Sequence, residues 1–281
     1  MSNDVTKEIQ DICKKILKEY IRICDKYELR YYLIDGSMLG AIRHEGFIPW
    51  DDDLDIAMPR PDYEKFCSIV KSELPDNMYW VSYEESIKGK SVGEIAQLYC
   101  SDIELEMDYF SERKTTNVWM DIMIMYGMPK GSVMQNVHYY FYYLHKGLAR
   151  MGHIENIGRR KYNLFERMAI SLARSLNLSK VLNTEKLLQR ATTILKKYSY
   201  DESSSIIIVP SEYGKREITL KDSYEPARKS KFEDLYVNVP RLAEQILTNL
   251  YGDYLKFPPK EERKSKHKVK ILNRVEMRHQ R

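Results

Sequence analysis

Long apolar runs, export signals and repetitive stretches are all missing from this 281-residue sequence. The longest apolar runs, such as 120–128 and 205–210, are far shorter than the ~20 residues that cross a bilayer as a helix. The first residues lack a basic flank followed by an apolar stretch, so we expect a cytoplasmic protein, peripheral at most to the inner face of the membrane. No internal repeat or low-complexity linker divides the chain, and we therefore expect one compact unit.

Cysteine is also scarce. The four cysteines are Cys13, Cys24, Cys67 and Cys100. They form no C-x-x-C pair, and no histidine lies at zinc-site spacing from them. This pattern is typical of reduced thiols, so we expect neither a structural zinc nor a disulfide.

Positive charge is concentrated at the C-terminal end. Residues 256–281 contain ten Lys or Arg and three Glu, a local excess of +7, whereas the rest of the chain carries −3. This basic tail has two interpretations: attraction to anionic lipid head groups or an anionic glycan polymer, and a solvated basic helix or frayed terminus. No base-reading motif accompanies the tail, so we expect no nucleic-acid partner.

Four aspartates, Asp51, Asp52, Asp53 and Asp55, fall within five positions. Carboxylates this close repel one another, so the cluster indicates a bound cation. Alternation along an extended strand would put Asp51, Asp53 and Asp55 on one side and Asp52 on the other. Carboxylate oxygens favour Mg²⁺ or Mn²⁺. An acidic surface loop or a calcium loop is the alternative, although a calcium loop requires a Gly and a downstream Glu at set offsets.

The segment before this cluster has the pattern of a strand, a turn and a helix. Residues 31–35 favour a strand that runs into Gly36 and Ser37, and residues 38–43 favour a short helix. The turn and the helix N-terminus offer backbone N–H groups to a phosphate, while aspartates on the next strand hold a metal against it. This order of elements indicates the nucleotidyltransferase fold.

Residues 35–56, which include Asp35-Gly36-Ser37 and Trp50-Asp51-Asp52-Asp53-Leu54-Asp55, resemble the signature of the LicD/fukutin family. The resemblance resumes at 118–122, 232–235 and 251–254. It implies a nucleotidyltransferase-like fold and a metal-dependent phosphotransferase. Bacterial members of the family are associated with transfer of phosphocholine from CDP-choline to cell-surface glycans, and other relatives transfer ribitol phosphate or other groups.

Asp121 stands between apolar neighbours in the strand-like run 118–124. A carboxylate buried there would require a metal or a hydrogen-bond network. The nucleotidyltransferase fold has a third carboxylate on a neighbouring strand, and by resemblance Asp121 is the candidate. It would act as a third metal ligand or as general base toward the acceptor hydroxyl, and an exposed strand-end aspartate is the plain alternative.

Cationic residues are needed to neutralise a donor pyrophosphate. Arg43 and His44 lie between the turn and the acidic cluster, and a guanidinium forks well onto phosphate oxygens, so Arg43 is the stronger candidate. Lys215 and Arg216 are a second option, with a solvent-exposed turn as the alternative.

Aromatic residues near the aspartates are candidates for base stacking or for a cage around a quaternary ammonium. Trp50 and Trp119 flank the acidic residues. The aromatic run 137–145 could serve as such a cage, but packing in an amphipathic helix or placement at a lipid interface is the commoner role.

Together these residues suggest a mechanism. A CDP-alcohol, with CDP-choline favoured, would bind its pyrophosphate over Gly36 and Ser37, bridged by Mg²⁺ to Asp53 and Asp55. A hydroxyl of a glycan or glycolipid acceptor (teichoic acid, lipopolysaccharide or capsule), activated near Asp121, would attack the distal phosphorus, and CMP would leave. Nucleotidyl transfer from a nucleoside triphosphate is the enzymatic alternative. A glycan- or membrane-binding module is the non-enzymatic one.

The expected architecture is an α/β (α+β) fold with a mixed sheet, flanking helices and a helical C-terminal addition. An apolar content of 43% is ample for its core. We expect an amphipathic helix within 1–29, a catalytic domain over 30–255 and the basic tail over 256–281. Expected helices lie at 4–28, from 60 onward, and at 162–178, 184–198 and 240–250; expected strands lie at 31–35, 54–58, 78–84, 95–100, 118–124 and 204–209, with a hairpin at 232–239.

Overall fold

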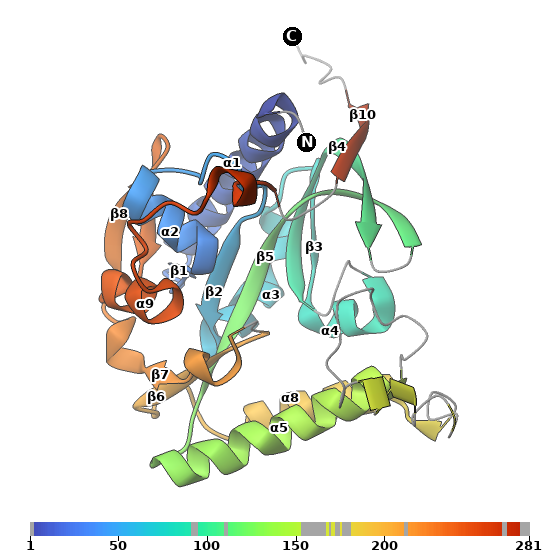
Figure 1. Cartoon of the computed structure of the whole chain (residues 1–281), viewed down its shortest axis with the longest axis vertical. Helices are drawn as coiled ribbons and strands as arrows, with labels where there is room; N and C mark the ends of the chain where they lie inside the picture. Colours follow the sequence, from blue (N-terminus) through green and yellow to red (C-terminus); the bar gives the residue numbers. More distant parts are fainter. Residues whose placement is uncertain are drawn as a thin grey trace.

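The computed structural model describes residues 3–90, 95–109, 112–152, 181–210, 213–265 and 269–275, with a few further positions between 167 and 175. An eight-stranded mixed sheet forms the centre of this described part (Figure 1). Its main path runs β1 (Tyr32–Leu33), β2 (Asp55–Pro59), β5 (Glu112–Gly127), β4 (Ala96–Tyr109) and β10 (Val269–Arg274). β3 (Met78–Val81) also pairs with β4, and β6 (Ser205–Val209) pairs with both β5 and β7 (Thr219–Leu220). The expected mixed α/β fold is confirmed.

The pairing of β2 with β5 is parallel, and the other pairings described in this sheet are antiparallel. Alternation along the two parallel strands separates two apolar faces. Ile56 and Ile122 belong to the large core, whereas Ala57 and Met125 belong to a smaller cluster on the other side. The sheet is therefore covered on both faces.

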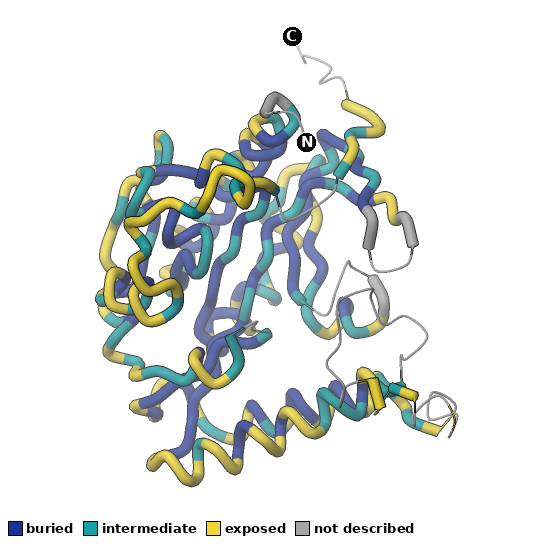
Figure 2. The backbone as a smooth tube through the Cα atoms, in the orientation of Figure 1, coloured by how far each residue is buried: buried dark blue, intermediate teal, exposed yellow. Residues whose placement is uncertain are grey.

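Helix α1 (Asn3–Lys26) covers the first face together with α3 (Arg60–Glu73). Its inward side is among the most deeply buried parts of the chain, as the dark segments in Figure 2 show. Most of the buried apolar residues of α1 recur at helical spacing: Ile9, Ile12, Cys13, Ile16, Leu17, Tyr20 and Ile23. The amphipathic helix expected over 4–28 is confirmed.

On the side of β1, helix α2 (Asp35–His44) packs against α9 (Ala243–Tyr251) and strand β8 (Arg228–Phe232). β8 forms a two-stranded hairpin with β9 (Leu235–Val239), close to the hairpin expected over 232–239. At the end of the sheet where β5 ends, α5 (Ser132–Gly152) lies across the molecule and packs on α8 (Thr184–Leu195) (Figure 1). Shorter elements are α4 (Tyr83–Glu85), η1 (Ser86–Lys90), η3 (Gly214–Glu217), η4 (Lys221–Ser223) and η5 (Lys260–Glu262).

The acidic cluster differs from the expected continuous strand. Strand β2 begins only at Asp55, and residues 51–54 are irregular. The reason is a tight turn, in which the backbone N–H of Asp51 donates to the carbonyl of Ile48 at 2.9 Å. Helix α2 also begins earlier than expected, at Asp35. Most of the helix expected over 162–178 lies outside the described residues.

The described part of the basic tail is tied to the body of the protein. β10 pairs with β4 in the main sheet, and Arg274 forms an ion pair with Glu8 of α1 (Nε to Oε1 2.6 Å). A free solvated helix or a frayed end does not describe residues 269–275. The sequence pattern missed this strand because its alternation is short and interrupted by charged residues.

The four cysteines are free thiols, and three of them are buried. No described helix combines the length and the apolar character that spanning a bilayer requires.

Candidate active site

Asp55 and Asp121 lie side by side. Asp55, the first residue of β2, pairs in register with Asp121 of β5. The backbone N–H of Asp121 donates to the carbonyl of Leu54 at 2.9 Å, which fixes the two strands where the aspartates stand. By alternation both carboxylates point to the face that carries Ala57 and Met125, and both residues are half-buried. The structure thus brings two of the predicted catalytic residues together.

Ser37 positions Asp55. Its hydroxyl oxygen accepts a hydrogen bond from the backbone N–H of Asp55 at 2.8 Å, and the carbonyl of Asp55 accepts from the N–H of Ile34 at 3.2 Å. Ser37 is only 6% exposed. The predicted phosphate-binding serine therefore connects the start of α2 to the start of β2, and its hydroxyl hydrogen remains a possible donor.

The glycine before Ser37 makes room for Asp51. A Cβ atom added to Gly36 would lie 2.9 Å from Oδ2 of Asp51, so a carboxylate packs directly against the first turn of α2. The N-terminal end of a helix stabilises a negative charge. Asp51 is buried, and its backbone carbonyl accepts from Nε2 of Gln10 at 2.7 Å. These contacts hold the acidic segment against both α1 and α2.

A buried glutamine holds Asp121. Nε2 of Gln97, which is 1% exposed on β4, donates to Oδ1 of Asp121 at 2.7 Å. The hydroxyl of Tyr99 in turn donates to Oε1 of Gln97. This chain of hydrogen bonds fixes the orientation of the Asp121 carboxylate. Sequence reasoning missed Gln97, although a glutamine between Ala96 and Leu98 in an apolar strand is the signal that points to it.

The other two aspartates of the cluster, Asp52 and Asp53, lie between Asp51 and Leu54 along the chain. Asp53 is half-buried, whereas Asp52 is buried, and its Oδ2 accepts from Oγ of Ser265 at 2.6 Å. Beneath them lies Cys13 of α1. Burial raises the pKa of the Cys13 thiol well above its usual range, and the charges of Asp53, Asp52 and Asp121 raise it further. Cys13 is therefore a protonated core residue and not a nucleophile.

Arg43, His44 and Trp50 come together in a cluster that the sequence did not fully reveal. The guanidinium of Arg43 lies 4.7 Å from the ring centre of Phe257 and donates to the carbonyl of Tyr254 at 2.7 Å. The guanidinium of Arg263 lies 5.5 Å from the ring of Trp50 and 5.2 Å from that of Phe257. We call Arg43, His44, Trp50, Phe257 and Arg263 the Arg43–Arg263 cluster. Phe257 and Arg263 were missed because they come from the segment interpreted only as a charged tail.

Within the Arg43–Arg263 cluster, positive charges face one another. Burial lowers the pKa of Arg43, and the neighbouring Arg263 lowers it further. Burial also lowers the pKa of His44, and Arg43 adds to this effect. Nε2 of His44 accepts from Nε of Arg43 at 3.0 Å, as expected of a neutral imidazole. The cluster contains two guanidiniums and no carboxylate. A bound anion would therefore stabilise it.

Comparison with known proteins agrees with this geometry. The family described as LicD/FKTN/FKRP, nucleotidyltransferase domain, matches residues 28–146. We call these matched residues the LicD domain. The lipopolysaccharide cholinephosphotransferase LicD of Haemophilus influenzae is 29% identical over 263 residues, which cover 93% of this chain and 95% of that protein. An uncharacterised protein of Rickettsia prowazekii is 29% identical over 136 residues, 46% of this chain and 47% of that protein. One of Rickettsia typhi is 38% identical over 56 residues, 20% of this chain and 18% of that protein.

These matches agree with the expected family and with the expected class of enzyme, a LicD-type phosphotransferase. The LicD domain contains the paired aspartates, Gln97 and Arg43. Phe257 and Arg263 lie outside the matched residues. The Arg43–Arg263 cluster therefore combines side chains of the LicD domain with side chains from the region C-terminal to it.

Lys215 and Arg216 do not join the Arg43–Arg263 cluster through any described contact. Both are exposed in η3, and Nζ of Lys215 lies 4.1 Å from the ring centre of Tyr140 on α5. Their neighbour Tyr213 turns toward α9 instead, and its hydroxyl donates to that of Tyr251 at 3.0 Å. Burial raises the pKa of Tyr251, and the charges of Asp35 and Asp55 contribute, so this tyrosine pair lies near the starts of α2 and β2.

The LicD domain offers carboxylates to a metal but no preformed cage. In the part of the chain that the structure describes, no group of three or more His, Cys, Asp or Glu side chains converges as a metal site. The in-register Asp55 and Asp121 still fit a Mg²⁺ ion of the kind that takes one or two protein carboxylates and completes its shell with substrate phosphate and water. The predicted metal ligands Asp51, Asp53, Asp55 and Asp121 stay a prediction.

Proposed function

We propose that this protein transfers phosphocholine from CDP-choline to a sugar of lipopolysaccharide or of its precursor. The observation that carries the proposal is the in-register pair of Asp55 and Asp121 on one face of the sheet. Similarity over nearly the whole length of a lipopolysaccharide cholinephosphotransferase supports the choice of transferred group and acceptor. The cytoplasm is the proposed compartment, because nucleotide-linked donors are made there.

Asp55 and Asp121, with Asp53 beside them, would hold Mg²⁺ or Mn²⁺. Such an ion would neutralise the charge that gathers on the donor phosphates as the bond breaks. The chain's own residues prepare this place: Ser37 holds the backbone of Asp55, and Gln97 holds the carboxylate of Asp121. Asp51 supports the start of α2 and is a less direct candidate, because it packs against Gly36.

In the proposed reaction, a hydroxyl oxygen of the acceptor sugar forms a bond to the phosphorus that carries choline. The bond from that phosphorus to the bridging oxygen of the pyrophosphate breaks, and CMP leaves with the electron pair. Asp121 accepts the proton of the hydroxyl, since Gln97 keeps its carboxylate oriented. A phosphodiester joins the sugar to choline in the product.

The Arg43–Arg263 cluster would bind the nucleotide part of the donor. Two guanidiniums suit the phosphate of CMP, and their mutual repulsion is relieved when an anion binds between them. The rings of Trp50 and Phe257, 6.2 Å apart, are candidates to stack on cytosine. Trp50 is thereby assigned to the base in preference to the ammonium group.

The test is to incubate the protein with CDP-choline, CDP-ribitol or CTP, with Mg²⁺ and lipopolysaccharide lacking phosphocholine. We expect CDP-choline to be consumed fastest and CMP to be released. Faster release of CMP from CDP-ribitol would replace choline by ribitol while keeping the reaction type. Release of pyrophosphate from CTP without turnover of either CDP-alcohol would make the protein a nucleotidyltransferase.

A further inference from the structure

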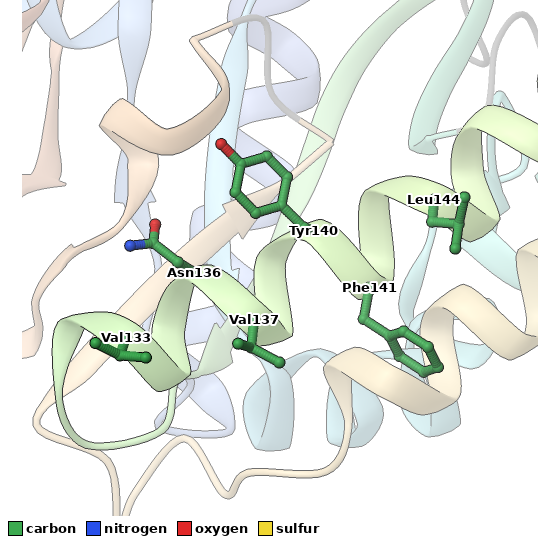
Figure 3. A pocket seen from close by; sticks show the side chains of 6 residues that line it. All are labelled: Val133, Asn136, Val137, Tyr140, Phe141 and Leu144. Carbon is green, nitrogen blue, oxygen red and sulfur yellow. The ribbon is translucent and has the colours of Figure 1, made fainter.

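Helix α5 carries an exposed apolar stripe. Five of its residues are more than half exposed and line a single open surface hollow: Val133 (73%), Val137 (57%), Tyr140 (58%), Phe141 (54%) and Leu144 (56%). Asn136 also lines it, and Figure 3 shows these side chains along the helix. Their spacing of three or four residues places them on one side of the helix. We call them the α5 stripe.

The opposite side of α5 is already used. Tyr139 and Tyr142 are buried in the main core, and Ala149 packs with Leu187 and Leu188 of α8. Tyr139 and Tyr142 therefore pack in the core, which is the role of an amphipathic helix considered for the run 137–145. Helix α5 is therefore apolar on its buried side and also on the exposed side that carries the α5 stripe. An exposed apolar surface of this kind is expected to bind a partner.

Charge indicates what kind of partner it is. α5 contains no Asp or Glu. The described residues 130–152 and 181–199 contain seven Lys or Arg and one Glu, an excess of +6. Lys130 before the helix and Arg150 in its last turn are exposed at the two ends of the stripe, and exposed Lys186 and Arg190 lie on α8. A basic surface with protruding aliphatic and aromatic side chains complements an anionic bilayer, whose interface accommodates tyrosine and phenylalanine.

We propose that the α5 stripe docks on an anionic phospholipid bilayer, with α5 lying in the plane of the interface. Val137, Phe141 and Leu144 enter the boundary of the acyl chains, and Lys130 and Arg150 contact the head groups. The basic tail is not the main anchor, because β10 holds its described part in the sheet.

This orientation sets the distance between the bilayer and the candidate active site. From Asp121, strand β5 runs six residues to its end at Gly127, about 20 Å at ~3.3 Å per residue, and α5 begins at Ser132 after four intervening residues. η3 lies between the two, because Lys215 stacks on Tyr140 while Tyr213 bonds to Tyr251. An acceptor sugar attached to a membrane lipid would need to reach only this far. The docking proposal itself does not depend on which group is transferred.

The experiment is flotation of the full-length protein with vesicles. One set of vesicles is phosphatidylcholine alone, and the other contains equal parts of phosphatidylcholine and phosphatidylglycerol. We expect binding to the anionic vesicles that weakens with salt. The double variant Phe141→Ser/Leu144→Ser should bind at least roughly tenfold more weakly, since two apolar side chains no longer enter the lipid. The matched control is Tyr236→Ser/Leu255→Ser, which changes side chains of similar exposure elsewhere and should bind as the unmodified protein does.

A second pair of variants separates the helix from the tail. Lys130→Gln/Arg150→Gln should reduce binding to the anionic vesicles severalfold, whereas Lys256→Gln/Lys260→Gln in the tail should not. All four double variants change exposed side chains, and thermal unfolding verifies that they fold. The proposal is overturned if the unmodified protein ignores anionic vesicles, or if the tail variant loses as much binding as the α5 variants. It is also overturned if light scattering shows a dimer that only Phe141→Ser/Leu144→Ser dissociates, because the stripe would then bind a second copy of the chain.

Discussion

Asp55 and Asp121 are partners across the parallel strands β2 and β5, although 65 positions separate them along the chain. Their side chains share one face only because the two strands pair in this register. A slip by one residue would send one carboxylate into the core that α1 covers. The candidate active site therefore depends on the central sheet, and its residues can be tested one by one against that framework.

The first prediction concerns the paired aspartates. Asp55→Asn or Asp121→Asn should lower turnover at least ~10²-fold, the effect of removing a principal electrostatic group. EDTA should abolish turnover, and added Mg²⁺ or Mn²⁺ should restore it. Asp52→Asn is the control, because Asp52 is bonded to Ser265 and should contribute little to the chemistry. Full activity in EDTA, or in either folded variant of the pair, would remove these carboxylates from the mechanism.

The second prediction concerns Gln97 as a positioning residue. Gln97→Leu removes the donor to Oδ1 of Asp121 and should lower kcat by about tenfold or more, with little change in KM for CDP-choline. Gln97→Glu should be worse, because it places a carboxylate against Asp121. Tyr99→Phe, which removes only the next bond in the chain, should have the smaller effect. Equal kcat in all three variants would mean that the network serves stability alone.

The third prediction tests the Arg43–Arg263 cluster by binding of CMP, measured by calorimetry. Arg43→Gln and Arg263→Gln should each weaken binding roughly tenfold, because each removes a charge-assisted contact to phosphate. Lys231→Gln is the matched control, since this lysine forms an exposed ion pair with Glu45 outside the cluster. If the two arginine variants bind CMP as well as the control does, the nucleotide lies elsewhere.

The fourth prediction follows from His44, whose pKa is lowered by burial and by Arg43 from its ordinary value of 6.5. The unfolded chain then binds a proton that the folded protein resists, so the free energy of unfolding should fall as the pH drops below about 6.5. Above that value the contribution of His44 is fully present. His44→Gln should reduce this slope in urea unfolding measured between neutral pH and about pH 5.5. An unchanged slope would contradict the burial of a neutral imidazole at His44. Part of the slope that remains in His44→Gln comes from His138, because burial also lowers the pKa of His138.

Local sequence predicted the parts of the site that follow one another along the chain. The short helix and the strand at Asp55 were found because their signals are short-range, whereas the turn expected at Gly36 and Ser37 is part of the helix. Even there, the start of β2 was misjudged, since the turn at Ile48 and Asp51 is a backbone feature that side-chain alternation does not report. The pairing of Asp121 with Asp55 was reached only through family resemblance.

Residues supplied by distant segments could not be predicted. Gln97 meets Asp121 through strand pairing, and Arg263 meets Trp50 because the chain returns to the sheet after α9. Lys215 was expected near the phosphates but stacks on Tyr140. Composition identified residues 256–281 as basic, yet charge alone did not reveal that β10 joins the sheet. Long-range contacts of this kind leave no periodic signal in the sequence.

The most direct test of the proposed function is the mass of the acceptor. Lipopolysaccharide that lacks phosphocholine is incubated with CDP-choline, Mg²⁺ and the protein, and its glycoforms are then weighed by mass spectrometry. We predict a gain of one phosphocholine unit with the unmodified protein and no gain with Asp55→Asn. An unchanged mass while CDP-choline is consumed would place the phosphocholine on another acceptor, and a gain equal to a nucleotide would contradict phosphocholine transfer altogether.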